Sequence, residues 1–158
     1  MTTMNTNLKA SRATTQFTNY GFNSYANFNG RQLAASDSGI SVLGGESDNG
    51  ADIEAYFEPV TTDFGDGHPK RLRFLYLGYE ADGQIVVTIA EAGKPAKAEA
   101  KTIGSKLVGQ QRARVPVSRV LSGRYWMFRI GNKNGSDFSI DSMHCLYLSR
   151  SHGLSQNT

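Results

Sequence analysis

Cysteine is nearly absent from this chain of 158 residues, which contains Cys145 alone. A single cysteine excludes a disulfide within the chain and a cysteine-based metal site built by one copy. The surrounding letters, "MHCLYL", predict that Cys145 is a small buried hydrophobic residue.

Long apolar runs are also missing. No stretch approaches the roughly twenty apolar residues of a membrane-spanning helix. The first residues, "MTTMNTNLKASRATTQFT", lack the apolar centre of a signal peptide. We therefore expect no membrane partner and synthesis in a reducing cytoplasm.

The motifs of the common enzyme classes are missing too. The chain has no G-x-S-x-G nucleophile motif and neither of the glycine motifs that bind phosphate. The triplet "DFG" at Asp63 to Gly65 occurs without the other kinase motifs, so it predicts an Asx turn. His144 and Cys145 are adjacent, so on a strand they would point to opposite faces and not form a catalytic pair. We expect no enzymatic activity, no catalytic residue and no cofactor.

One loop contains acidic residues that could form a metal site. In "DFGDGHPK", Asp63, Asp66 and His68 lie close in sequence and could in principle hold a divalent cation. The spacing is not that of an EF-hand, and turn formation accounts for these residues better. A calcium ion that joins two loops stays open as an alternative, although we assign no metal ligand.

Charge of one sign is not concentrated anywhere in the chain. Seventeen Lys and Arg residues against fourteen Asp and Glu residues give a net charge of +3. Arg112 and Arg114 alternate with apolar residues, as on the wet face of a strand. Nucleic acid is not an expected partner, although a small basic excess permits it.

The chain is rich in glycine, with 17 residues, and its apolar residues recur with a period near two. Asn29-Gly30 predicts a hairpin turn, and Pro95 interrupts the one segment with a helix-favouring composition. The pattern predicts an all-β fold, an antiparallel jelly-roll β-sandwich with an extended N-terminal arm and an extra N-terminal hairpin. The expected strands are 20–28, 31–35, 39–43, 51–60, 70–79, 83–90, 98–103, 111–117, 123–132 and 137–148.

Composition divides the chain into four segments. Residues 1–17 form a polar N-terminal arm, expected to be disordered unless a neighbour orders it. Residues 18–48 form the N-terminal hairpin and a loop, and residues 49–148 the jelly-roll sandwich. Residues 149–158 form a polar C-terminal tail of similar character.

Alternation indicates which side chains face the core. Three sets are predicted to do so: Ile53, Ala55 and Phe57; Ile85, Val87 and Ile89; Ala113, Val115 and Val117. One strand has two apolar faces, with Leu72, Phe74 and Tyr76 on one side and Leu75, Leu77 and Tyr79 on the other. Such a strand is either covered on both sides or half of an interface.

The segment "RYWMFRIGNKNGSDFSIDSM" predicts a second hairpin. Tyr125 to Ile130 would run in, Asn134-Gly135 would turn, and Phe138 to Leu148 would run back through the middle of the sandwich. Its aromatic residues are expected to hold the fold together.

Three segments together resemble structural proteins of tailed bacteriophage virions: "NFNGRQLAASDSGISVLGG", "DFGDGHPKRLRFLYLGYEADGQIVVTI" and "GRYWMFRIGNKNGSDFSIDSM". The similarity is one of pattern and covers roughly Tyr20 to Leu148. It implies a β-sandwich building block of a virion, in the tail or its tip, in a fibre-attachment complex or as a head decoration protein. Its partners would be other virion proteins and copies of itself, after synthesis in the host cytoplasm.

The same closing segment is similar to the last strands of jelly-roll carbohydrate-binding modules, which leaves a bacterial-surface glycan as an alternative partner. Exposed aromatic residues could stack on sugar rings, and the candidates are Trp126, Tyr125, Tyr76, Tyr79, Tyr20 and Tyr25. The leading hypothesis is a non-enzymatic virion structural protein. The subunit interface would comprise Tyr20, Phe22, Tyr25 and Phe28, extended by exposed members of Leu75, Leu77 and Tyr79.

Overall fold

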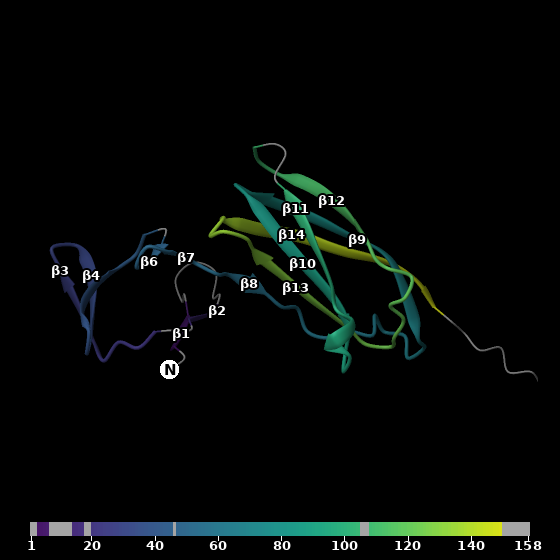
Figure 1. Cartoon of the computed structure of the whole chain (residues 1–158), viewed down its shortest axis with the longest axis horizontal. Helices are drawn as coiled ribbons and strands as arrows, with labels where there is room; N and C mark the ends of the chain where they lie inside the picture. Colours follow the sequence, from purple (N-terminus) through teal and green to yellow (C-terminus); the bar gives the residue numbers. More distant parts are fainter. Residues whose placement is uncertain (1–2, 7–13, 18–19, 46, 105–107, 150–158) are drawn as a thin grey trace, which may run out of the picture. The chain divides into compact units, whose positions relative to one another are not determined.

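A computed structural model describes residues 3–6, 14–17, 20–45, 47–104 and 108–149, with side chains from residue 20 onward. The chain divides into two compact units, Met1–Gly45 and Glu46–Thr158, called here the N-terminal and C-terminal units (Figure 1). The C-terminal tail predicted for 149–158 lies, beyond Ser149, outside the described residues.

The described residues of the N-terminal unit form five strands. Their bounds are Thr3–Thr6 (β1), Thr14–Phe17 (β2), Ser24–Phe28 (β3), Arg31–Ser36 (β4) and Gly39–Leu43 (β5). β1 pairs antiparallel with β2, so two strands lie where the sequence predicted an extended, disordered arm. β3, β4 and β5 form a separate antiparallel sheet in that order.

The predicted turn between β3 and β4 is confirmed. Asn29 and Gly30 have φ angles of 49° and 76°, both in the left-handed region that a type I′ turn requires. Phe28 therefore pairs directly with Arg31, and Tyr25 with Ala34.

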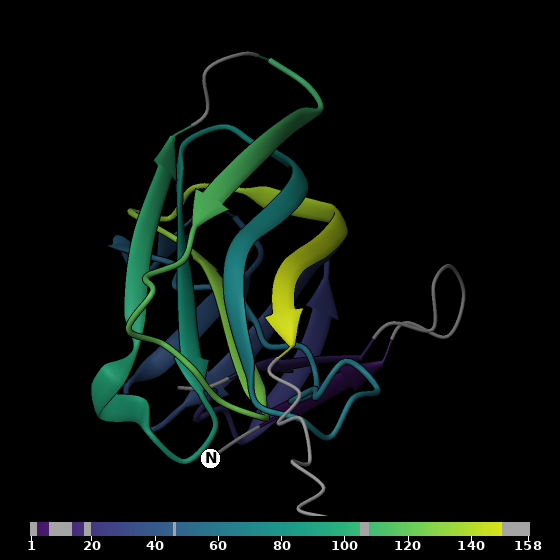
Figure 2. The ribbon, with the colours of Figure 1, turned by 90° about the vertical axis from the view of Figure 1, so that its right-hand side faces the viewer.

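Two antiparallel sheets form most of the C-terminal unit. The first has the order β11-β10-β13-β8 and the second the order β12-β9-β14. Figure 2 shows β12, β9 and β14 as one layer with β14 at its margin. The bounds are Tyr56–Phe57 (β8), Lys70–Ala81 (β9), Gln84–Glu91 (β10), Glu99–Gly104 (β11), Gln111–Pro116 (β12), Trp126–Asn132 (β13) and Phe138–Ser149 (β14). A short hairpin, Ser47–Asp48 (β6) with Ala51–Asp52 (β7), precedes them.

Alternate residues of both sheets form the core of this unit. Ile85, Val87 and Ile89 of β10 are fully buried, as the period-two pattern predicted. In β12 and directly after it, Val115 and Val117 are buried and Ala113 is partly buried, while Arg112 and Arg114 are exposed, as predicted. The fold is therefore all-β with antiparallel sheets and is β-sandwich-like.

The two apolar faces of β9 have an explanation that the sequence pattern missed. Leu72 is fully buried on the same side as Leu75, whereas alternation had placed it with Phe74 on the other side. The register with β14 shifts here, because Leu146 pairs with Phe74 while Tyr147 pairs with Leu72. This bulge inserts one residue and reverses the direction of every side chain before it.

The strand predicted for 51–60 is largely absent. Only Tyr56–Phe57 (β8) pairs with β13. Ile53 and Phe57 are 42% and 50% exposed and Ala55 is exposed too, so the prediction that these three residues belong to the core is wrong. The reason is the side chain of Asn132. Its Oδ1 accepts a hydrogen bond from the Ala55 N–H (2.9 Å), and its Nδ2 donates to the Ile53 carbonyl (2.7 Å). These bonds replace the strand ladder that the segment would otherwise have made.

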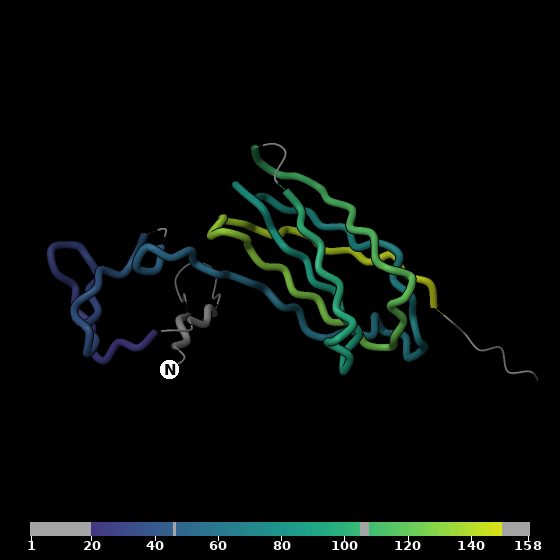
Figure 3. The backbone as a smooth tube through the Cα atoms, in the orientation of Figure 1, coloured from purple at the N-terminus to yellow at the C-terminus, as the bar shows by residue number. Residues whose placement is uncertain are grey.

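The predicted hairpin of β13 and β14 is also wrong. The turn at Asn134-Gly135 is present, with φ angles of 57° and 70°, but the strands on either side of it belong to different sheets (Figure 3). β13 lies between β10 and β8, while β14 lies at the end of the other sheet. The turn therefore connects two layers, and β14 is an edge strand.

The described residues form no α-helix, only a short 3₁₀ turn at Pro95–Lys97, so no helix among them could span a membrane.

Candidate functional site

One face of the sheet of β3, β4 and β5 carries mostly apolar side chains, with Ser24 and Arg31 at its margins. Cross-strand pairing places Ala26 opposite Leu33 and Leu33 opposite Val42, and residues directly opposite one another share a face. Ala35 is likewise opposite Ile40. We call this surface the apolar face; it comprises Ala26, Phe28, Leu33, Ala35, Ile40 and Val42.

The largest side chains of the apolar face are exposed. Phe28 is 72% exposed, Ile40 76% and Val42 55%. A contiguous apolar patch on a sheet is unusual at a protein surface and marks a site of association. Phe28 was among the predicted interface residues, whereas Ile40 and Val42 were not. Their alternation in "GISVL" was the available signal.

The other three predicted interface residues form a cluster in the same unit. The rings of Tyr20 and Phe22 meet edge to face, with centroids 5.0 Å apart, and Tyr20 stacks on Tyr25 at 6.0 Å. Tyr25 pairs directly with Ala34 and so lies on the face opposite to Phe28. The structure thus brings Tyr20, Phe22 and Tyr25 together and places Phe28 on the apolar face instead.

Burial within the described part of the N-terminal unit is slight. Ala34, at 1% exposure, is its one buried hydrophobic residue among positions 20–45. A sheet of three strands needs a hydrophobic face that is covered to be stable in water. The apolar face provides the side chains for such burial, so a partner that covers it would stabilise the sheet.

Leu75, Leu77 and Tyr79 do not extend this surface. The two leucines are fully buried and Tyr79 is 3% exposed, so no exposed member exists among them, and all three belong to the core. The Tyr79 hydroxyl donates to the Gly104 carbonyl at 3.1 Å, and burial raises the pKa of this phenol. β9 has apolar residues on both faces in the sequence pattern because its bulge shifts the alternation, and its core-facing side is covered by the other sheet.

The loop that contains Asp63, Asp66 and His68 makes turns and carries no metal-ligand cluster. The Asp63 carboxylate accepts a hydrogen bond from the Gly65 N–H (3.0 Å), which confirms the predicted Asx turn. Asp66 accepts from the Ser149 hydroxyl (2.6 Å) and from the His68 N–H (3.0 Å). Across the described residues, no three His, Cys, Asp or Glu side chains are close enough to hold a metal ion.

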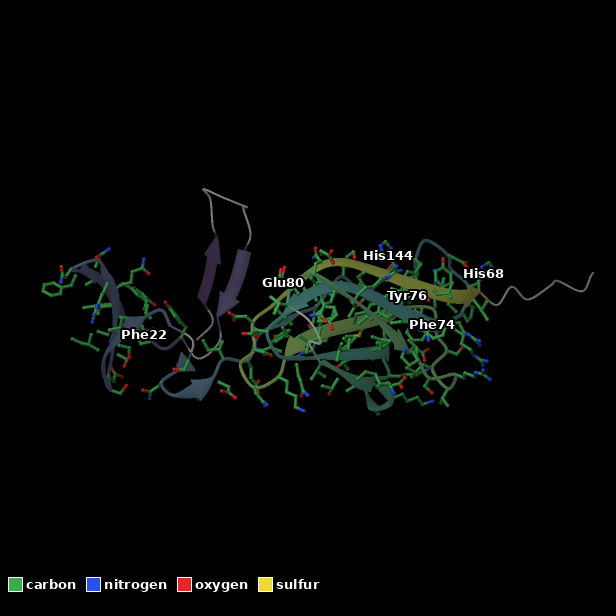
Figure 4. All side chains as sticks on the ribbon, turned by 90° about the horizontal axis from the view of Figure 1, so that it is seen from above. Phe22, His68, Phe74, Tyr76, Glu80 and His144 are labelled. Atoms are coloured by element: carbon green, nitrogen blue, oxygen red, sulfur yellow. The ribbon has the colours of Figure 1, made fainter. Side chains whose placement is uncertain are left out.

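Asp66 also shows why this cluster is not a hydrolytic triad. Its carboxylate lies between Ser149 and the His68 ring, whose Nδ1 is 2.6 Å away (Figure 4 labels His68). In a triad the histidine must lie between the serine and the carboxylate to take the serine proton. The bond from Ser149, followed by those from His68, holds the pKa of Asp66 well below its usual range.

His144 and Cys145 point to opposite faces, as predicted. His144 is opposite Tyr76 on the outer face of its sheet, and both are labelled in Figure 4. Cys145 is opposite Leu75 on the core side, and burial raises the pKa of its thiol to about 12. This thiol is therefore neither paired with an imidazole nor activated as a nucleophile.

The aromatic residues weighed for sugar stacking are mostly covered. Trp126 is fully buried and its Nε1 donates to the Gly123 carbonyl at 3.2 Å. Guanidinium groups lie over the rings of Tyr76 (Arg112, 5.0 Å) and Tyr125 (Arg124, 4.9 Å). Among these candidates of the C-terminal unit, Trp126 and Tyr79 are buried, and Tyr76 and Tyr125 each have a guanidinium over one ring face.

A scan of protein-family models finds no match to this chain, and neither does a comparison with curated proteins or with solved structures.

Proposed function

We propose that this chain is a non-enzymatic structural protein of a bacteriophage particle that acts through protein–protein contacts made by the apolar face of its N-terminal unit. The observation that carries the proposal is the exposure of Phe28, Ile40 and Val42 on a sheet with a single buried hydrophobic residue. Burying each of these side chains in a contact would contribute about 1.5–3 kcal/mol. The assignment to a virion rests on the sequence resemblance, and within the virion we propose a location in the tail or its tip.

We also propose that the C-terminal unit is a jelly roll. Three antiparallel pairs are nested along the chain: β8 with β13 outermost, β9 with β12 inside it, and β10 with β11 innermost. A long hairpin rolled into two sheets has this nesting, and a jelly roll has eight strands. The observed order supports a jelly roll in which the described residues provide no strand in the place before β8, the strand that would pair with β14.

The sugar-binding alternative has weaker support. One shallow hollow of about 170 Å³ lies on the outer face of the four-stranded sheet, between Tyr56, Arg129 and Asn132. The Arg129 guanidinium lies 3.7 Å from the centre of the Tyr56 ring and covers it. Because a sugar stacks on an open ring face, this arrangement favours a cation–π contact that holds the sheet surface together.

The proposal predicts that a charge on the apolar face prevents assembly. The double substitution Ile40→Lys and Val42→Lys should reduce incorporation into particles of the phage that encodes the chain by roughly tenfold or more, since an interface anchor contributes 2 kcal/mol or more. Incorporation is measured by quantitative immunoblotting of purified particles and by electron microscopy of the same preparation.

The matched control is Ser41→Lys. Ser41 lies between the two substituted residues on the same strand, but it faces the other side of the sheet, opposite Ala34. This variant should be incorporated like the unaltered chain. Equal incorporation of the double variant, or normal particles without the chain, would count against the proposal. Titration of host surface polysaccharide against the same variants tests the sugar-binding alternative directly.

A further inference from the structure

The outer edge of β14 has no partner strand among the described residues. β14 pairs with β9 on one side only and is the end strand of its sheet (Figure 2). An edge strand presents a row of free N–H and C=O groups that can pair with another chain.

The core behind this edge is incompletely covered. All the core-facing apolar residues of β14 are only partly buried, whereas those of the neighbouring β9 are almost fully buried. Phe57, on the end strand of the other sheet, is opposite Ile130 and so shares its core-facing side, yet it is 50% exposed. The partly buried residues of β14 are Phe138, Ile140, Met143, Cys145 and Tyr147.

The other end strands of the C-terminal unit are protected against pairing, and β14 is not. β12 carries Arg112, Arg114 and Pro116, β11 is short and charged, and β8 has two residues. Arginine, lysine, proline and short length are the usual devices that prevent edge-to-edge association. In β14 the bulge at Asp141 interrupts the first part, but no lysine, arginine or proline follows between Met143 and Ser149.

We propose that this stretch of β14 binds the same stretch of a second copy, antiparallel, and so joins two three-stranded sheets into one sheet of six strands. Length favours a second copy over β5. Among the described strands only β9 and β14 have 12 residues, and β9 is already paired on both sides, whereas β5 has 5. The matching free edge is therefore β14 itself.

The alternation of β14 restricts the register of this pairing. Met143, Cys145 and Tyr147 face the core and His144, Leu146 and Leu148 face outward, and paired residues must share a face. The two-fold axis must therefore pass through a residue, which then lies opposite its own copy. If the axis passes through Leu146, Met143 of one copy lies opposite Ser149 of the other, so that every residue from Met143 to Ser149 is paired.

This register also adds cover to the core. The axis is perpendicular to the sheet, so the core-facing side of one copy continues into that of the other. Cys145 then lies opposite Tyr147 of the second copy, and both become more buried. Leu146, which is 50% exposed, lies opposite its own copy on the outer face.

Hydrogen exchange of the unaltered full-length chain tests the proposal without any substitution. Sedimentation across a dilution series should show a monomer–dimer equilibrium. In the dimer, the amides of 143–149 that point away from β9 should exchange at least about tenfold more slowly than in the monomer. Amides of the opposite edge strand β12 should exchange equally in both states. A monomer at every concentration, or a dimer with unchanged exchange in β14, would overturn the proposal.

Hydrogen exchange also distinguishes a second copy from other segments that could pair with the free edge of β14. If the amides of 143–149 that point away from β9 stay protected in the diluted monomer, a segment of the same chain covers the edge, and this would overturn the proposal. A dimer that protects 39–43 together with 143–149 would point to β5 as the partner, with the same consequence.

A charge exchange tests the register. Leu146→Lys and Leu146→Glu should each weaken dimerisation by roughly tenfold or more, because like charges would lie opposite one another. An equal mixture of the two variants should dimerise again. The control is Met127→Lys, since Met127 is 43% exposed but lies on β13 in the other sheet. Dimerisation of each charged variant alone, like that of the control, would contradict the axis at Leu146.

This inference does not depend on the proposed function, because the two use different units of the chain. The Leu146→Lys variant tests dimerisation alone, and the Ile40 and Val42 substitutions test incorporation alone. Either proposal can therefore fail while the other holds.

Discussion

At the scale of single residues, Asp66 fastens the end of β14 to the loop before β9. Its carboxylate binds the Ser149 hydroxyl, the His68 backbone and the His68 ring, and Lys70 Nζ lies 4.0 Å away. The Lys70 ammonium is fully buried and is held by the carbonyls of Asp66 and His68. A single carboxylate thus connects two segments far apart in the sequence.

This carboxylate should make stability depend on pH. The hydrogen bond from Ser149, followed by those from His68, lowers the pKa of Asp66 in the folded protein below its value in the unfolded chain, about 3.9. A lowered folded-state pKa stabilises the fold above pH ~4, and this contribution is lost as the pH falls further. Urea unfolding of the unaltered chain should therefore give a free energy of unfolding that declines below that pH.

Two variants test this origin. Asp66→Asn should remove that part of the pH dependence, and Ser149→Ala should reduce it, because the Ser149 hydroxyl is the largest single cause of the shift. The same decline in Asp66→Asn as in the unaltered chain would assign the effect to other carboxylates.

At the scale of elements, β8 is attached to its sheet mainly through Asn132. The side-chain amide of Asn132 bonds to the backbone at Ile53 and Ala55, and its backbone N–H donates to the Ala55 carbonyl at 3.0 Å. The segment before β8 is otherwise exposed. The Asn132 side chain therefore provides hydrogen bonds that a backbone ladder between two strands usually provides.

Replacing Asn132 by Ala should release this segment. Two hydrogen bonds are lost, so we expect a cost of about 1–3 kcal/mol in the free energy of unfolding and faster amide exchange over 53–57. Exchange mass spectrometry together with chemical denaturation provides both values. Lys133→Ala is the control, because Lys133 is exposed and its hydrogen bonds to Gln84 and Ser136 are made by its backbone, which the substitution retains. Similar exchange over 53–57 in both variants would show that Asn132 does not hold the segment.

The elements also show what the sequence could and could not predict. Period-two alternation identified the buried set Ile85, Val87 and Ile89 and the hairpin at Asn29-Gly30, because these follow from local pattern and turn chemistry. It misplaced Leu72, since a bulge is a property of two strands and has no signal in one. It also misjudged Phe57, whose exposure depends on which strands lie beside it.

The candidate site was predictable in part for the same reason. Phe28 was found from its place in an aromatic-rich strand, while Leu75, Leu77 and Tyr79 were selected because both faces of β9 looked apolar. Only the second sheet of the C-terminal unit, which covers one of those faces, shows that they are core residues.

At the scale of the whole molecule, the two units differ in how much they bury. The C-terminal unit contains almost all of the buried hydrophobic residues described, and Ala34 alone represents the N-terminal unit. A unit with its own core can fold by itself. The N-terminal unit has the composition of a segment that gains its stability from contacts.

Deleting residues 1–45 should therefore leave the C-terminal unit folded. We expect cooperative unfolding with a free energy within about 1 kcal/mol of the full-length value, since no core residue of that unit is removed. The fluorescence of Trp126, the one tryptophan and a fully buried one, reports this unfolding. A truncated chain with solvent-exposed Trp126 fluorescence would show that the first unit is needed for the second to fold.

The position of β14 at the end of its sheet has a consequence for the kinetics of folding. Lys70 pairs with Ser149 and Ala81 with Phe138, so this ladder closes one of the longest loops in the unit, whereas β10 and β11 pair across a short connection. Closing long loops is slow, and sheets of this kind fold in milliseconds to seconds. During synthesis, the edge of β9 that pairs with β14 leaves the ribosome well before β14 does. Nascent chains should therefore be most prone to misassociation in that interval, and β14 should be the strand whose arrival ends it.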